Sequence, residues 1–496
     1  MRARILPRSS GFDRRWLTLI VTTIGSFMSI LDSTIVNVAL PDILRDFGAN
    51  LERGQLVLTG YLLALAIVIP LSGFLAERIG MKRLYLITLA CFTLGSALCG
   101  LAWNLPSLIG FRVIQGLGGG MIQPLGMAIV FTMITPRERA SFMGLLGLPM
   151  LLAPLLGPTL GGYLVEYVSW RFIFLINLPI GVANIILAWL LLKEMPRRPE
   201  ARFDAPGFVL ALIGFPSLLL ALSEGSAYGW TSPLVLGLGT VGVTALIALV
   251  VLERRLAEPL LQIRLFSHPM FALAMSINFV TQFSLFGMTY LLPLLLQQAH
   301  GLGAAATGWA LFPSGVMSFI TMNVGGALYN RVGPRRLALS GLAVLVVATG
   351  MLSRTSAETA IWVIAALASL RGVAMGLCMM PVQTVAYNTV PDGQMPRATA
   401  LTSVLFRLFG SASTAILTAV LVIGLQLNGA PGGATITSGA VSSDALFSAF
   451  DLAFVVMAVM AAGGMVLALF LKDPVIEEMK AEQRDAAVER HAFAAE

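Results

Sequence analysis

The chain has 496 residues, of which 57% are hydrophobic and only 11% are charged, and its mean hydropathy is +0.86. Soluble domains carry about 25% charged residues, so this composition excludes a soluble globular protein and predicts one whose solvent is a lipid bilayer. The three cysteines and three histidines show no metal-ligand spacing and no disulfide framework, so neither a metal nor a cofactor is expected.

Apolar segments long enough to cross a bilayer as helices, about 20 residues each, recur along the whole chain. Five arginines precede the first segment, as in a signal peptide, but that segment is too long and no small-residue cleavage site follows it. It is therefore expected to remain as the first span. We predict fourteen spans, near residues 16–40, 55–76, 84–103, 107–133, 140–165, 170–192, 206–223, 233–252, 270–297, 305–329, 337–353, 360–386, 399–424 and 450–471.

The distribution of lysine and arginine predicts the orientation. With the N-terminus inside, 25 of the 32 basic residues fall on the inner side, and only Arg45, Arg53 and Arg354 fall on the outer side. Cytoplasmic loops are enriched in Lys and Arg, so both termini are predicted to be cytoplasmic. This pattern also explains the net charge of +7 better than nucleic-acid binding does. The polar segment after Pro474 is predicted to be a solvated or surface helix.

A short motif occurs twice. The loop after the second span reads GFLAERIGMKR (73–83), and the loop after the tenth reads GALYNRVGPRR (326–336). Six positions agree in G-x3-[EN]-R-x-G-x-[KR]-R at an offset of 253 residues, which indicates two related halves. The offset exceeds six spans by one helical pair, so we predict an all-α membrane fold in a 6+2+6 plan. Its units are an N-terminal half (1–195), a two-helix insertion (196–265), a C-terminal half (266–472) and a cytoplasmic tail (473–496).

Paired halves with this loop motif resemble the major facilitator superfamily, and fourteen spans resemble its drug:proton antiporter branch, the EmrB/QacA-like multidrug efflux transporters. The resemblance covers about residues 16–472. It implies the major facilitator fold in a bacterial plasma or inner membrane, and export driven by a proton gradient without a cofactor. The other matching stretches are LDSTIVNVALP (31–41), FRVIQGLGGG (111–120), GLPMLLAPLLGPTLGGYL (147–164), WRFIFLINLPIG (170–181) and PLLQIRLF (259–266).

The resemblance implies that the repeated loop is a conformational latch. In the family, the acidic position of the loop faces the N-terminus of a helix in the other half and holds the outward-open state; here that position is Glu77, where the family usually has aspartate. A carboxylate there gains about 0.3–1 kcal/mol, a suitable size for a reversible contact. The alternative is that these charges only set topology. The expected latch residues are Gly73, Glu77, Arg78, Gly80, Lys82, Arg83, Asn330, Arg331, Arg335 and Arg336.

The fifth span is rich in glycine and proline. Small residues allow close helix packing and proline bends helices. The spacing GPxxGG at 157–162 resembles the signature of exporters in the superfamily, and the alternative is ordinary packing. The residues of this exporter motif are Gly147, Pro154, Gly157, Pro158, Gly161 and Gly162.

Among the acidic residues, Asp32 alone lies well inside a predicted span. A charge at mid-membrane costs about 2.5–3.5 kcal/mol on insertion scales, so it usually faces a cavity or a partner. At 1.5 Å per residue, Asp32 lies roughly 12 Å and Arg112 roughly 8 Å from the outer ends of their spans, which the resemblance places side by side. Burial disfavours the charged carboxylate and arginine favours it. We therefore expect Asp32, Arg112 and the nearby Gln115 to couple transport to protons; the alternative is a static ion pair.

A substrate cavity is expected where aromatic and amide residues recur at three- and four-residue spacing in the ninth span, with further residues in spans 1, 2 and 12. Such stripes also occur in ordinary helix packing. Arg371 and Arg407 lie within spans too, where they could pair with backbone carbonyls or attract anionic groups. The expected cavity residues are Phe27, Met28, Tyr61, Asn278, Phe279, Gln282, Phe283, Phe286, Tyr290, Met379 and Gln383.

The expected function is proton-driven export of amphipathic or cationic compounds, and hence antibiotic resistance. The alternatives are export or flipping of lipids or lipid-like metabolites, and a non-transporting membrane sensor or scaffold. No nucleophile–base set or Walker-type loop in the sequence indicates an enzyme or an ATP-driven pump. The expected partners are a small amphipathic substrate, protons, the lipid bilayer and, from the resemblance alone, a periplasmic adaptor; a monomer is expected, and no nucleic acid.

Overall fold

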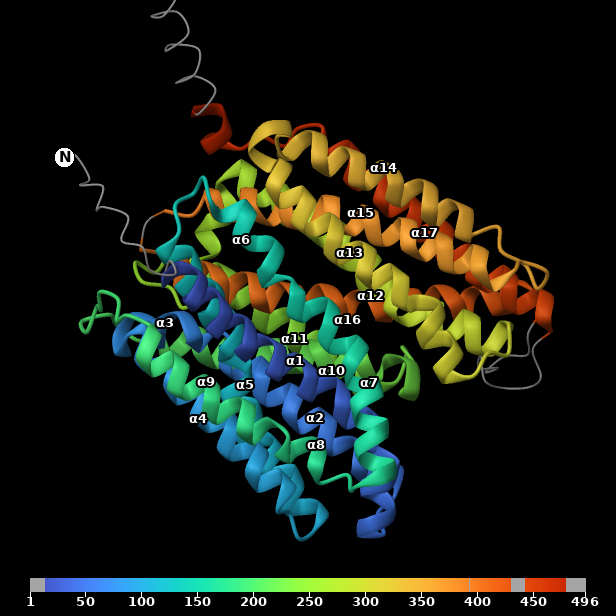
Figure 1. Ribbon diagram of the computed structural model, residues 1–496, viewed down its shortest axis with the longest axis horizontal. Helices are drawn as coiled ribbons and strands as arrows, with labels where there is room; N and C mark the ends of the chain where they lie inside the picture. Colours follow the sequence, from blue (N-terminus) through green and yellow to red (C-terminus); the bar gives the residue numbers. More distant parts are fainter. Residues whose placement is uncertain (1–13, 392, 430–441, 479–496) are drawn as a thin grey trace, which may run out of the picture.

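The computed structural model describes residues 14–391, 393–429 and 442–478, in which the secondary structure is helical (Figure 1). The arginines before residue 14 and most of the predicted tail helix lie outside the described residues. The elements are α1 (Arg14–Phe47), α2 (Leu51–Val68), α3 (Leu71–Ile79), α4 (Met81–Gly100), α5 (Leu105–Met133), α6 (Arg139–Leu146), α7 (Leu148–Tyr167), α8 (Phe172–Leu175), α9 (Asn177–Leu191), α10 (Ala205–Tyr228), α11 (Pro233–Glu253), η1 (Ile263–Ser267), α12 (Pro269–Leu294), η2 (Leu295–Ala299), α13 (Ala304–Val332), α14 (Pro334–Leu352), α15 (Ile361–Asn388), α16 (Met395–Leu427) and α17 (Ser443–Ala468).

Each predicted span contains one of these helices or a broken pair. Within the described residues, twelve helices are long and apolar enough to cross a membrane, or thirteen when the bent pair α2–α3 counts as one span. An all-helical membrane fold is therefore confirmed. The fourteen-span 6+2+6 plan, the unit boundaries and the cytoplasmic termini stay predictions.

Two spans predicted as single helices are broken in the structure. The second bends by 55° between α2 and α3, where Pro70 precedes the first residue of α3. The fifth, predicted at 140–165, is divided at Gly147 into α6 and α7, and Pro149 lies in the first turn of α7. Proline has no N–H to donate to the preceding turn, which explains both breaks.

The prediction that Asp32 is the only acidic residue well inside a span is wrong, because Asp451 lies inside α17. The last span was predicted from about residue 450, but α17 begins at Ser443, and the Ser442 hydroxyl accepts a hydrogen bond from the Ala445 N–H at 3.3 Å. Asp451 therefore lies about two turns inside the helix. The polar residues of the first turn conceal this helix start in the sequence.

The long helices form two groups that lie side by side (Figure 1). The first group contains α1 to α9, and the second contains α12 to α17. The helices α10 and α11 pack against each other, and α10 contacts α2 of one group and α16 of the other. Direct contacts between the groups join α3 and α5 to α16, and α6 to α13 and α15.

Candidate functional site

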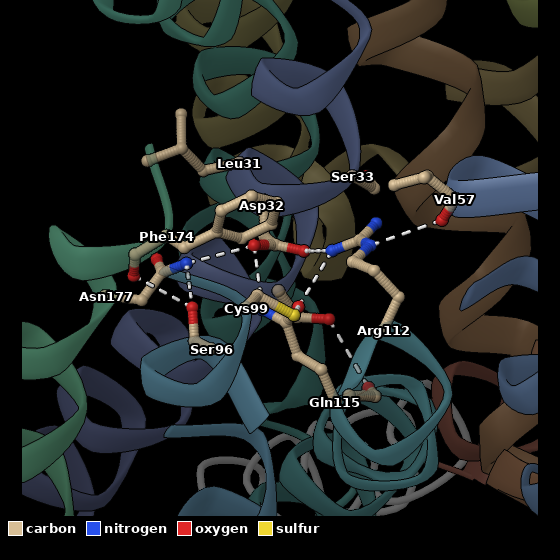
Figure 2. A network of polar contacts seen from close by, with 12 residues as sticks. Leu31, Asp32, Ser33, Val57, Ser96, Cys99, Arg112, Gln115, Phe174 and Asn177 are labelled. Atoms are coloured by element: carbon tan, nitrogen blue, oxygen red, sulfur yellow. Dashed lines mark hydrogen bonds and ion pairs between the residues drawn. The ribbon is translucent and has the colours of Figure 1, made fainter. Parts of the chain in front are cut away.

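A buried ion pair lies inside the first helix group (Figure 2). Nη1 of Arg112 donates to Oδ2 of Asp32 at 2.6 Å, and the exposed fractions of the two side chains are 1% and 0%. The helix α5 begins after Asn104, whose side chain accepts a hydrogen bond from the Ser107 N–H at 2.8 Å, so Arg112 lies about two turns inside it. The two residues pair as their predicted depths in the membrane suggest.

Two amides complete the surroundings of the Asp32 carboxylate (Figure 2). Nε2 of Gln115 donates to Oδ1 at 2.8 Å, and Nδ2 of Asn177 donates to the same oxygen at 3.0 Å. Asn177 also donates to Oγ of Ser96 at 3.1 Å, which extends the network to α4. Sequence reasoning missed Asn177 and Ser96, because a neutral polar residue in an apolar segment gives a much weaker signal than a charge.

A glycine allows α4 to approach the ion pair. A Cβ atom added at Gly95 would lie 2.6 Å from the Cα of Gln115, which is closer than carbon atoms tolerate. Only glycine therefore lets α4 and α5 pack at this distance, and this contact positions the Gln115 amide against Asp32.

Tyr61 contacts the ion pair and also lines a central cavity. Cζ of Arg112 lies 4.0 Å from the centroid of the Tyr61 ring, and Nε of Arg112 donates to the Val57 carbonyl oxygen at 3.4 Å. Tyr61 also lines a cavity of about 560 Å³, whereas Asp32 and Arg112 are not among the described lining residues. The carboxylate is thus outside the described cavity lining, and Tyr61 is shared by the cavity and the surroundings of the ion pair.

The cavity is lined by α1, α2 and α5 of the first group and by α12, α13, α15 and α16 of the second. Of the predicted substrate residues, Tyr61, Gln282 and Phe286 line it. Both arginines whose role the sequence left open, Arg371 and Arg407, line it as well. The predicted residues that are not part of this described lining are Phe27, Met28, Asn278, Phe279, Phe283, Tyr290, Met379 and Gln383.

Several of these residues pack between helices instead. Asn278 is fully buried and donates to the Ala274 carbonyl oxygen at 3.1 Å. Phe283 belongs to a buried apolar cluster, against which Phe279 and Tyr290 pack. Aromatic and amide residues at three- and four-residue spacing lie on one face of a helix. The spacing alone does not show whether that face lines a cavity or packs against a neighbouring helix.

The first repeated loop lies where the two helix groups meet. Nε and Nη2 of Arg397, at the start of α16, donate to Oε1 and Oε2 of Glu77 at 2.9 and 2.7 Å, and both side chains are buried. A Cβ atom at Gly73 would lie 2.8 Å from the Cα of Arg397, so this close contact requires glycine. The acidic position of the loop thus faces a helix N-terminus of the other group, and its partner Arg397 was expected only as one of the 25 basic residues on the inner side.

The second loop makes a neutral contact at the matching place. Nδ2 of Asn330 donates to the Arg137 carbonyl oxygen at 2.9 Å. Nζ of Lys82 donates to the Trp189 carbonyl oxygen at 2.6 Å, and Arg83 lies 3.7 Å from Glu194, so these two basic residues make contacts within the first group. The other basic residues of the two motifs are exposed; they are Arg78, Arg331, Arg335 and Arg336.

The glycines of the exporter motif pack α7 against α1. A Cβ atom at Gly157 would lie 2.2 Å from Oγ1 of Thr34, and one at Gly161 would lie 2.8 Å from Cγ1 of Ile35. Gly147, between α6 and α7, packs against Met322 of the other group. A Cβ atom at Gly162 would meet open space. Pro154 and Pro158 lie in α7, and their side chains are outside the described part of the structure.

A family model described as the Major Facilitator Superfamily matches residues 22–415. The chain belongs to this superfamily. As a superfamily member with at least twelve apolar helices, it is a multi-pass transporter of the cell membrane and not an enzyme. No group of three or more His, Cys, Asp or Glu residues in the described part of the chain could hold a metal ion.

Relatives within the superfamily cover most of the chain. The uncharacterized MFS-type transporter YhcA of Bacillus subtilis (strain 168) is 37% identical over 402 residues, which make up 81% of this chain and 76% of the relative. The multidrug resistance protein B homolog of Mycobacterium tuberculosis (strain ATCC 25618 / H37Rv) is 34% identical over 405 residues, 81% of this chain and 75% of that one. These relatives confirm the predicted kinship with multidrug efflux transporters.

A solved structure has a similar fold. The crystal structure of the human organic anion transporter MFSD10 (TETRAN) matches with a TM-score of 0.63, over 90% of this chain and 99% of that one, at 17% sequence identity. A likeness at this identity supports the fold alone.

Proposed function

We propose that the chain is a proton-coupled antiporter that exports amphipathic small molecules by alternating access. The observation that carries the proposal is the buried Asp32–Arg112 pair, to which two amides donate hydrogen bonds and which contacts Tyr61 of the cavity lining. A buried ion pair is often no more stabilising than apolar side chains of the same volume. Its place in an otherwise apolar bundle therefore favours a functional role over a structural one.

Protonation of Asp32 would weaken the contacts of α1 with its neighbours. In this state the carboxylate accepts hydrogen bonds from Arg112 of α5 and Asn177 of α9. Protonation removes the Coulomb attraction between the carboxylate and the Arg112 guanidinium, so a neutral carboxyl would bind Arg112 less tightly. Loading and release of a proton would thus alternately loosen and tighten these helices, with Gln115 as a third hydrogen-bond donor to the carboxylate.

The contacts of the repeated loops support an alternating-access cycle. Glu77–Arg397 and Asn330–Arg137 join the two helix groups at the predicted cytoplasmic loops. We infer that the present state is closed at the cytoplasmic end, and that both contacts separate when the cavity opens there. In this cycle the Glu77–Arg397 ion pair acts as the latch, and the packing of α7 on α1 guides the movement.

Transport by vesicles with an imposed pH gradient tests the proposal, with a panel of amphipathic compounds as substrates. Asp32→Asn should lose gradient-driven transport and the accompanying proton flux, while equilibrium binding of the same compounds persists. Asp42→Asn is the matched control, because it makes the same chemical change near the exposed end of the same helix. Full gradient-driven transport by Asp32→Asn would refute the assignment of the proton site.

A further inference from the structure

We propose that the central cavity binds an anionic head group carried on an apolar body, and that Arg371 and Arg407 receive this head group. The proposal rests on the proposed export function, because it names the class of substrate that the cavity would accept. The charged side chains of the cavity lining are these two arginines, and the described lining contains no aspartate or glutamate. Its remaining residues are apolar, hydroxyl or amide side chains, such as Phe286, Ser403 and Gln123.

Arg371 has one hydrogen bond to the protein and unused donors. Its side chain lines the cavity although the residue is only 6% exposed. Nη2 donates to the Ser284 carbonyl oxygen at 2.6 Å, while Nε is buried and has no partner among the described residues. Buried donors are nearly always paired, and a guanidinium carries five N–H groups in a planar fork that fits a carboxylate or phosphate. The cavity is the side from which such an acceptor can approach.

Arg407 has no counter-ion in the described structure. It lies in α16, is partly buried and lines the cavity, and no described side chain or backbone group forms a hydrogen bond or ion pair with it. Arg397 of the same helix, by contrast, is paired with Glu77. Arginines within membrane-spanning segments are costly unless they pair or face water, and they often mark a substrate pathway. A bound anion would compensate the charge of Arg407.

The two halves of the molecule differ in their corresponding first and fourth spans. In the first half, Arg112 of the fourth span pairs with the Asp32 carboxylate of the first span. In the second half, Arg371 of the fourth span reaches Ser284 of the first span and finds only a backbone carbonyl there. The fourth span of each half thus contains an arginine. Among the described residues, this arginine pairs with a carboxylate in the first half and not in the second. We infer that a ligand carboxylate, sulfonate or phosphate takes the place of the missing acid.

The size of the cavity favours an amphiphile with a single compact body. Its volume of about 560 Å³ lies within the range of roughly 300–1,000 Å³ that is usual for sites of drug-sized ligands. An anionic phospholipid has the same head-group chemistry, but its acyl chains would have to extend beyond the cavity. The two sources of the anion can be separated by experiment.

Equilibrium binding without a pH gradient tests the anion site directly. The protein is placed in phosphatidylcholine nanodiscs and titrated with three probes that differ only in the head group: 1-pyrenebutyrate, 1-pyrenebutanol and 1-pyrenebutylamine. The anionic probe should bind most tightly. Arg407→Gln should weaken its binding about tenfold, as expected for the loss of one charge-assisted contact, and should leave the binding of the neutral probe unchanged. Arg407→Lys should restore part of the loss.

The control variant is Arg354→Gln, which removes an exposed arginine outside the cavity lining and should leave all three affinities unchanged. Arg371→Gln should weaken anion binding as well, and its melting temperature is measured in parallel because Arg371 also holds Ser284. Equal binding of the three probes, or unchanged binding of 1-pyrenebutyrate by Arg407→Gln, would overturn the proposal.

Nanodiscs that contain phosphatidylglycerol identify the source of the anion. Competition of this lipid with 1-pyrenebutyrate through Arg407 would support the anion site and assign it to a lipid head group, whereas the absence of competition would support a soluble amphiphile. Because no gradient is applied, failure of this experiment leaves the proton site at Asp32 untouched. Failure of the gradient-driven assay would in turn leave the binding preference for anions intact.

Discussion

The two copies of the repeated loop have the same backbone design. Gly80 and Gly333 follow the last residues of α3 and α13, and both have positive φ angles, of 105° and 86°, which favour glycine. Gly73 and Gly326 both press against the other helix group: an added Cβ would lie 2.8 Å from the Cα of Arg397 in one loop, and 2.5 Å from the carbonyl oxygen of Ala140 in the other. The repeated glycines therefore fix where the two halves touch.

The loops differ in the side chain at the fifth position of the motif. Glu77 forms a buried ion pair with Arg397, whereas Asn330 is exposed and donates a single hydrogen bond to the Arg137 carbonyl oxygen. A further contact between the two helix groups comes from Arg139, in the first turn of α6, which donates a hydrogen bond to the Tyr387 carbonyl oxygen at 2.8 Å. Contacts at matching places in the two loops thus differ in charge and burial through one residue of the motif.

The largest effect is expected for Glu77→Gln, because this change leaves the Arg397 guanidinium buried without its charge partner. Removing one partner of a buried ion pair typically lowers the free energy of unfolding by about 3–5 kcal/mol. Thermal unfolding of the purified protein should show a correspondingly large fall in melting temperature. Glu77→Asp keeps the charge on a shorter side chain, so its melting temperature should lie between those of the wild type and Glu77→Gln. A melting temperature equal to that of the wild type would show that the ion pair does not hold the two groups together.

A smaller effect is expected for Asn330→Ala. The variant loses one exposed, neutral hydrogen bond to the Arg137 carbonyl oxygen, which corresponds to about 0.5–1.5 kcal/mol. The same thermal unfolding measurement should give a modest fall in melting temperature. If Asn330→Ala destabilises the protein as much as Glu77→Gln does, the two loops contribute equally and the asymmetry is refuted.

The smallest effect is expected for the pH dependence of stability that comes from a carboxyl group near the second loop. Asp473 follows α17, and its carboxylate accepts hydrogen bonds from the Tyr329 hydroxyl and from Nδ2 of Asn388. Burial raises the pKa of Asp473 above its ordinary value of 3.8, and the hydrogen bonds from Tyr329 and Asn388 oppose this rise. Because its pKa is higher in the folded than in the unfolded state, its stabilising contribution is complete below pH 3.8 and is lost as the pH rises through the folded pKa.

The melting temperature of the wild type should therefore decrease more between about pH 4 and pH 7 than that of Asp473→Asn, which has no carboxyl group to titrate. Parallel curves for the two proteins would show that Asp473 does not contribute to the pH dependence.

The sequence predicts the helices well because their apolar length is set by the bilayer, whatever their neighbours are. It predicts their interruptions less well. Pro70 and Gly147 were visible, but a rule that counts apolar residues extends through both. The start of α17 was missed for the opposite reason, since its first turn is polar and was assigned to a loop.

The candidate site was predictable where charge limits the possibilities. Asp32 and Arg112 had few other partners at their depth in the membrane, and they lie together. The neutral Asn177 carried no comparable constraint. The cavity lining was predicted least well, because helices that are apolar on every side do not reveal which face they turn toward a cavity. Arg397 illustrates a further limit: a basic residue at a membrane boundary satisfies the topology rule, which conceals its ion pair with Glu77.

The position of Asp32 outside the described cavity lining has an electrical consequence. A proton and a cargo that occupy separate places each carry their own charge across the membrane. With a proton moving inward and a monoanion moving outward, two elementary charges cross in the same sense. At about 2.3 kcal/mol per charge per 100 mV, the membrane potential would contribute roughly 4.6 kcal/mol per 100 mV to each cycle. Export of a monocation by the same exchange would be indifferent to voltage, so the charge of the cargo would decide whether the transporter draws on the membrane potential at all.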